Sequence, residues 1–176
     1  MDVVAVCASL SLPHIFYGLV WTNPKQFMKM VKQKISPQAD PVNVVVTVAH
    51  SLKIWQFSSF SMWYFQHGPL PSVAAVGWLR ILSGLALFTV GQSLNIGVYN
   101  ALGKDGVYYG TRLGKSVPWC TGFPFTVCSN PQYVGSAMTF WGITLLLYTP
   151  AHASMILIGV FISACYATSA YIEDTM

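Results

Sequence analysis

Long stretches without a charged side chain constrain this chain more than any other feature. Its 176 residues include only nine Lys or Arg and five Asp or Glu, 8% of the chain, whereas about 25% is usual in a soluble domain. Hydrophobic residues make up 54%. So little charge cannot cover the surface of a water-soluble domain. The composition disfavours a soluble enzyme, a disordered protein and a nucleic-acid binder, and it predicts a single-domain polytopic membrane protein.

The charges separate uncharged runs that are about as long as a membrane span, which needs roughly 20 apolar residues. Five hydrophobic segments follow from this spacing: residues 3–21, 42–65, 81–102, 131–149 and 151–172. Pro13 and His14 interrupt the first segment, which either spans the membrane or lies in its interface. The segments are too long for barrel strands. The expected fold is therefore all-α, a membrane bundle of four to five helices whose last two form a hairpin.

The basic residues gather in two connections, and this orients the chain. Four lysines lie between the first and second segments, and Lys104, Arg112 and Lys115 lie between the third and fourth. Short loops rich in Lys and Arg stay in the cytosol. Both connections and the C-terminal pair Glu173-Asp174 are therefore expected on the cytosolic side. The net charge of +4 is a signal of topology, and no nucleic-acid partner is expected.

Lys53 is a cation near the middle of the second segment. A lysine at the centre of a bilayer costs about 2.5–3.5 kcal/mol on insertion scales, so it must face a cavity, pair with an anion or extend to the interface. One interpretation is a contact with an anionic lipid phosphate. The other is an ordinary span, which either starts after Lys53 or lets the side chain extend along the helix to the headgroup region.

The connection from Gly103 to Gly135 is rich in glycine and aromatic residues. Its glycines allow tight turns and close approach of the backbone. Asn130-Pro131 predicts the start of a helix, because Asn caps helices and Pro fits the first turn. Tyr133 would then lie in the first turn, where free backbone amides favour an anionic group. The alternative is an ordinary capped helix with no ligand.

The last hydrophobic segment ends in two adjacent carboxylates, Glu173 and Asp174. Such a pair can hold an ammonium, a sulfonium or a ribose diol, or it can be a solvated helix end. The four cysteines form no CxxC pair, and no histidine completes a zinc-site spacing. They are expected to be free thiols, and no metal site is predicted.

Taken in order, these elements resemble the phospholipid N-methyltransferase family, specifically the small phosphatidylethanolamine and phosphatidyl-N-methylethanolamine methyltransferases. The match covers about residues 80–174 and is carried by three motifs. They are Ala101-Leu102-Gly103-x-x-Gly106-x-x-x-Gly110, then Phe123-Pro124-Phe125 with Asn130-Pro131-x-Tyr133-x-Gly135-Ser136, and finally Glu173-Asp174. A broader similarity to isoprenylcysteine carboxyl methyltransferases lies in the Pro-x-Tyr-x-Gly motif and the acidic hairpin end.

The resemblance implies methylation of phosphatidyl-N-methylethanolamine and phosphatidyl-N,N-dimethylethanolamine to phosphatidylcholine, with S-adenosylmethionine as methyl donor. Whether phosphatidylethanolamine is also an acceptor stays open. The family's setting is the endoplasmic reticulum membrane, and the topology turns the site toward the cytosol. The alternatives are an isoprenylcysteine carboxyl methyltransferase-like enzyme and a non-enzymatic membrane scaffold.

The resemblance also implies site residues. A short Gly-x-Gly element of the family falls on Thr89-Val90-Gly91, where only the second glycine matches, and its Glu-Glu pair falls on Glu173-Asp174. The cofactor contacts are assigned to Thr89, Val90, Gly91, Gly103, Asn130, Pro131, Tyr133, Glu173 and Asp174. Glu173 is either a general base or a cofactor ligand. The lipid headgroup is assigned to Lys53, Tyr108 and Arg112.

Overall fold

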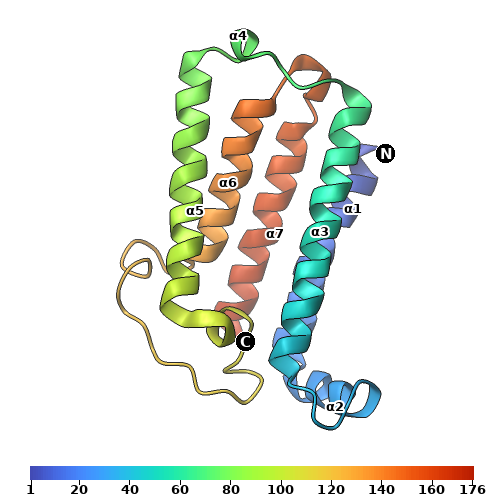
Figure 1. Ribbon diagram of the computed structural model, residues 1–176, viewed down its shortest axis with the longest axis vertical. Coiled ribbons are helices and arrows are strands. Elements are labelled where there is room, and N and C mark those ends of the chain that lie inside the picture. The colour runs from blue at the N-terminus through green and yellow to red at the C-terminus, as the bar shows by residue number, and fades with distance from the viewer.

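The computed structural model describes residues 1–176 as helices and connections, with no strand. Four long helices and one of 17 residues run along a common direction (Figure 1). In chain order the helices are α1 (Val3–Thr22), α2 (Pro24–Lys34), α3 (Pro41–His67), α4 (Val73–Val76), α5 (Trp78–Val107), α6 (Pro131–Leu147), the 3-10 turn η1 (Pro150–His152) and α7 (Met155–Thr175). The predicted all-α class and the terminal hairpin of α6 and α7 are confirmed.

Local chemistry explains where several helices begin. The Asp2 carboxylate accepts a hydrogen bond from the Ala5 amide at 2.7 Å and caps α1. Asp40 accepts from the Val42 amide at 3.0 Å, and Pro41 fills the first position of α3. Pro131 opens α6 as predicted, but the Asn130 side chain makes no capping bond. Its amide donates instead to Asp174 at the end of α7.

Helices α1, α5 and α7, the last counted together with η1, are long and apolar enough to cross a membrane. Helix α3 has 27 residues but a more polar composition, and α6 has 17 residues. That α3 and α6 also cross the membrane, which would give the predicted total of four to five spans, stays a prediction. Large apolar side chains on the outer surface, such as Leu79 at 80% exposed and Trp78 at 75%, suit contact with lipid.

Helices α5 and α6 pack with their backbones in close approach at two pairs of glycines. A Cβ atom added at Gly91 would lie 2.4 Å from the carbonyl oxygen of Gly135, and one at Gly142 would lie 2.7 Å from that of Gly84. Small residues at a membrane helix contact permit this distance, and dispersion forces between the backbones hold the pair. Helices α6 and α7 also pack on each other, as do α1 and α7.

Helix α5 ends in a sharp change of direction at Gly103, whose φ of +63° is in the left-handed region. Beyond this kink the chain turns beneath the bundle, toward the end where the C-terminus and α2 lie (Figure 1). Tyr109 and Leu113 then pack with Val20, Val42 and Val45 in a cluster between α1 and α3. The kink thus brings residues of the long connection under the helix ends.

We expect Gly91→Ala to destabilise the protein by about 1–3 kcal/mol, the usual effect of overpacking a close contact, because the added methyl group meets Gly135. The matched control is Gly18→Ala in α1, where an added Cβ meets nothing within 4 Å. Thermal unfolding of the detergent-solubilised protein measures both. Equal melting temperatures for the two variants would contradict the close α5–α6 contact.

Candidate functional site

The acidic pair at the end of α7 is joined to two other segments by hydrogen bonds. The phenol groups of Tyr109 and Tyr133 both donate to the same carboxylate oxygen of Glu173, Oε1. The Asn130 side-chain amide donates to Asp174 Oδ2 at 3.0 Å. The connection after α5, the start of α6 and the end of α7 therefore meet at the two carboxylates. Hydrogen bonds to a charged group are about twice as strong as neutral ones.

Tyr109 is held in place by its backbone and by its surroundings. Its φ of +62° is unusual for a residue other than glycine, and its side chain is 8% exposed. The rings of Tyr17 and Trp21 meet it edge-on, at centroid distances of 5.6 and 5.1 Å. Burial, with the nearby Tyr133 and Glu173, raises the pKa of Tyr109 far above its ordinary value. The phenol therefore stays protonated and remains a donor to Glu173.

A cavity of about 630 Å³, here called the acidic cavity, opens beside these groups. Its walls come from the end of α1, the end of α5, residues 117–125 and the start of α6, with Glu173 from α7. Such a volume is typical of pockets for small ligands. The Glu173 carboxylate suits an ammonium or a diol, and aromatic rings such as Trp119 and Tyr133 suit a flat base or a sulfonium.

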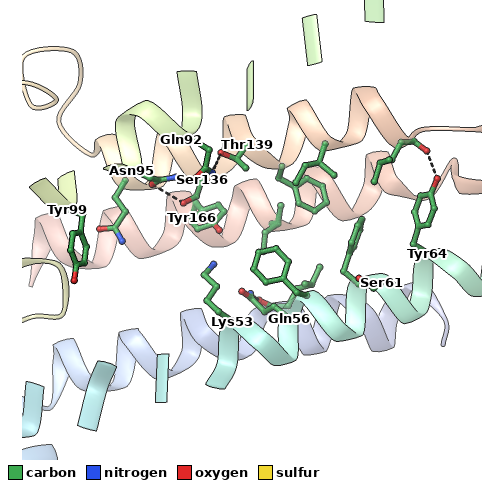
Figure 2. A pocket seen from close by; sticks show the side chains of 18 of the residues that line it. Lys53, Gln56, Ser61, Tyr64, Gln92, Asn95, Tyr99, Ser136, Thr139 and Tyr166 are labelled. Carbon is green, nitrogen blue, oxygen red and sulfur yellow. Dashed lines mark hydrogen bonds between the residues drawn. The ribbon is translucent and has the colours of Figure 1, made fainter. Parts of the chain in front are cut away.

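A second cavity of about 580 Å³, here called the groove, lies between α3 and α5, with α6 and α7 behind it. Figure 2 shows side chains from these four helices pointing into it. Polar groups lie toward the end of the bundle that holds Glu173 and Asp174, here called the acidic end. They are Lys53, Asn95, Tyr99, Tyr108, Gln132 and Ser136. Mostly apolar side chains line the rest, among them Phe57, Phe65, Leu70, Phe140, Ile143 and Leu147. The groove therefore suits a molecule with a polar head and an apolar tail.

The groove and the acidic cavity adjoin. Val107 and Gln132 line both of them, while the successive residues Tyr108 and Tyr109 line the groove and the acidic cavity respectively. A group held in one cavity can therefore meet a group held in the other at the Val107–Gln132 boundary. Two separate ligands that must react with each other need such a junction.

The structure brings together most of the predicted site residues. Asn130, Pro131, Tyr133 and Glu173 line the acidic cavity, and Asp174 is bonded to Asn130. Gly103 forms the kink of α5, which is followed by two residues of the acidic-cavity wall, Gly106 and Val107.

The residues assigned to the lipid headgroup are divided between the two cavities. Lys53 and Tyr108 both line the groove. The Arg112 guanidinium instead lies over the ring of Trp21, 4.1 Å from its centroid, and Trp21 is part of the acidic-cavity wall. At this distance the two groups form a cation–π contact.

The structure does not bring residues 89–91 to either cavity. Thr89 and Val90 are exposed and line neither cavity, and Gly91 lies against α6. The next residue, Gln92, faces the groove and donates to Thr139 Oγ1 at 2.9 Å. A residue three positions further along α5, Asn95, lies on the same face.

Several residues of the site were not found from the sequence. Tyr17 and Trp21 come from the first segment, which carried no motif. The polar residues Gln92 and Asn95 on α5, and Ser136 and Thr139 on α6, recur at helical spacing in apolar helices. Such a polar face within a hydrophobic segment indicates a surface that does not contact lipid, and it could have predicted the groove.

Comparison with known proteins gives concordant results. The family model described as phospholipid methyltransferase matches residues 79–176. A phosphatidyl-N-methylethanolamine N-methyltransferase of Arabidopsis thaliana is 41% identical over 128 residues, 73% of this chain and 70% of the relative. A protein of the same name from Saccharomyces cerevisiae is 39% identical over 80 residues, 45% of this chain and 38% of the relative. Another from Emericella nidulans is 44% identical over 64 residues, 35% of this chain and 31% of the relative. No solved structure matches.

We expect Tyr109→Phe to destabilise the protein by about 1–3 kcal/mol, because Glu173 loses one of its two phenol donors. The matched control is Tyr171→Phe, an exposed tyrosine on α7 whose hydroxyl forms no hydrogen bond. Melting temperatures of the solubilised variants measure the difference. A Tyr109→Phe protein as stable as the control would show that the Glu173 contact contributes nothing.

Proposed function

The chain belongs to the phospholipid methyltransferase family, and we propose that it methylates phosphatidyl-N-methylethanolamine and phosphatidyl-N,N-dimethylethanolamine to phosphatidylcholine. S-adenosylmethionine is the proposed methyl donor, and phosphatidylethanolamine is a further candidate acceptor. The observation that carries the proposal is the pair of adjoining cavities. One suits a small polar ligand, and the other suits a lipid.

The acidic cavity is the proposed cofactor site. S-adenosylmethionine contains an amino acid group, a sulfonium, a ribose diol and an adenine ring. One oxygen of the Glu173 carboxylate accepts two phenol hydrogens, and the other has no partner within the chain. That second oxygen is free to accept from an ammonium or a diol. The surrounding aromatic residues, including Tyr133 and Trp119, fit the ring and the sulfonium.

The groove is the proposed site of the acceptor lipid. Lys53 lines its polar part and forms no ion pair with any acidic residue of the chain. Its ammonium is therefore free to contact the lipid phosphate, which is the first of the two interpretations of Lys53 given by the sequence. The apolar part beyond Phe57 and Phe140 fits acyl chain. In this arrangement the headgroup amine is directed toward the boundary with the acidic cavity.

The bound donor supplies an electrophilic methyl carbon, which bonds to the amine nitrogen while the carbon–sulfur bond breaks and its electron pair goes to sulfur. The chain's residues hold the two partners at the Val107–Gln132 boundary and exclude water from the apolar part of the groove. An amine withdrawn from water ionises less readily, so the groove favours its neutral, nucleophilic form. Glu173 lies in the acidic cavity, which supports a ligand role over that of a general base.

The proposed setting is the endoplasmic reticulum membrane, with the site toward the cytosol. Helix α2, which carries four lysines, lies at the same end of the bundle as the C-terminus (Figure 1). Lys104 and Lys115 donate hydrogen bonds to Asn43 and Asp40 at the start of α3, the helix that follows α2. The prevalence of Lys and Arg in cytosolic loops supports this orientation. A cytosolic cavity also receives a water-soluble donor directly, while the groove between α3 and α5 receives a lipid from the bilayer.

We expect Glu173→Gln to weaken binding of S-adenosylhomocysteine by about 10- to 150-fold, the loss corresponding to a charged hydrogen bond worth about 1.5–3 kcal/mol. Methyl transfer from labelled donor should fall with it. The control is Asp105→Asn, which removes a carboxylate near the same end of the bundle whose side chain forms no hydrogen bond or ion pair. Thermal shift with the product cofactor measures binding separately from activity.

The acceptor is tested by supplying the wild-type protein with one candidate at a time. The candidates are phosphatidylethanolamine, its mono- and dimethylated forms, and a farnesyl-cysteine analogue. Labelled phosphatidylcholine from the mono- and dimethylated lipids is the expected product. Methylation of the farnesyl-cysteine analogue alone, or unchanged binding in the Glu173→Gln protein, would refute the proposed substrate or the proposed site.

A further inference from the structure

Helix α2 (Pro24–Lys34) carries lysines at the acidic end of the bundle: Lys25, Lys29 and Lys32 recur at one-turn spacing on one face, and Lys34 is the last residue of the helix. It connects α1 to α3 and lies at the same end as the C-terminus (Figure 1). Lys25, Lys29, Lys32 and Lys34 are all exposed, and no acidic residue occurs between Asp2 and Asp40. Four cations within ten residues thus stand on one short helix with no compensating charge nearby in sequence.

The opposite side of α2 is fixed to the bundle. Val31 is fully buried, and Phe27 and Met28 pack against the cluster of Val20, Val42, Val45, Tyr109 and Leu113. The ring of Phe27 meets that of Phe16 of α1 at a centroid distance of 6.2 Å. Because these apolar contacts hold the helix, the direction of its lysine face is set by the fold and does not depend on a ligand.

The lysine face has no partner within the chain. The only ion pair of the molecule joins Lys115 to Asp40 at 2.8 Å, and none of the four α2 lysines donates a side-chain hydrogen bond. Met30 is 43% exposed and Ile35 is 57% exposed beside them. Exposed apolar side chains among unpaired cations are characteristic of a helix that lies in the headgroup region of a membrane.

We propose that the lysine face of α2 binds anionic phospholipids of the leaflet in which the acidic cavity opens, and that this binding raises the rate of methyl transfer. Basic clusters directly beside a membrane helix attract anionic headgroups, and α2 begins two residues after the apolar helix α1 ends. Charge complementarity selects an anionic lipid over the zwitterionic substrate and product. The apolar Met30 and Ile35 add the contact with acyl chain that a free polyanion would not use.

The packing of α2 links this surface to the site. Phe27 and Met28 contact the same cluster that includes Tyr109, and Trp21 packs on that cluster too. Tyr109 in turn donates to Glu173. Lipid bound to α2 therefore adds to the contacts that hold one wall of the acidic cavity in place. This part of the inference rests on the proposed function, whereas lipid binding by α2 does not.

Binding is tested with the purified full chain in mixed micelles that contain phosphatidylserine and phosphatidylcholine. Native mass spectrometry counts the lipids retained by the wild type, by K25Q/K29Q/K32Q/K34Q and by the charge-retaining K25R/K29R/K32R/K34R. We expect the wild type and the arginine variant to retain phosphatidylserine preferentially. The glutamine variant should lose this preference, by about fivefold for each lysine neutralised.

Equal retention of phosphatidylserine by the glutamine variant and the wild type would overturn the proposal. So would displacement of the retained lipid by inorganic phosphate, because a general anion site would then explain the binding. Weaker retention at high salt is expected, since screening acts on exposed charges.

The effect on activity is tested in vesicles of phosphatidylcholine with and without added phosphatidylserine. The wild type and the arginine variant should work faster with phosphatidylserine, whereas the glutamine variant should keep the basal rate and show no rise. A rise in the glutamine variant as large as in the wild type would contradict the link to the site. No methyl transfer by the wild type in any vesicle would instead contradict the proposed function and leave the binding result intact.

Discussion

The arrangement of this end of the molecule depends on how a carboxylate is accommodated at the end of an apolar helix. Partly burying Glu173 without hydrogen-bond donors would cost several kcal/mol. Tyr109 and Tyr133 supply two donors to one of its oxygens. Those phenols come from the connection after α5 and from the first turn of α6, so one interaction positions three chain segments that are distant in sequence. The cavity beside them exists because these segments meet there.

Two further features let the segments meet. The left-handed backbone at Gly103 turns the end of α5 beneath the bundle, and the Gly91–Gly135 contact brings the axes of α5 and α6 close together. As a result Val107 and Gln132 form a boundary between a polar cavity and a groove that is largely apolar. A membrane enzyme with one water-soluble substrate and one lipid substrate needs a junction of this kind. Water dissolves only the first substrate and the bilayer dissolves only the second.

The helices and the acidic end could be predicted because they depend on local sequence. Runs without charge indicated the long helices, and Asn130-Pro131 indicated the start of α6. The partners of these residues could not be predicted, because they depend on contacts between distant segments. Asn130 binds Asp174 in place of capping its own helix, and Gly91, assigned to the cofactor by resemblance, lies in a helix contact. Tyr17 and Trp21 belong to the site only through the packing of α1.

The two-cavity arrangement is tested most directly by photo-crosslinking the wild-type protein in membranes with phosphatidyl-N-methylethanolamine that carries a diazirine in one acyl chain. Peptide mapping then locates the label. The expected attachment is to residues of the groove on α3 and α6, such as Phe57 and Phe140, with less labelling when unlabelled lipid competes. Competed labelling confined to the outer face of α5, at exposed residues such as Leu82 and Val90, would contradict it.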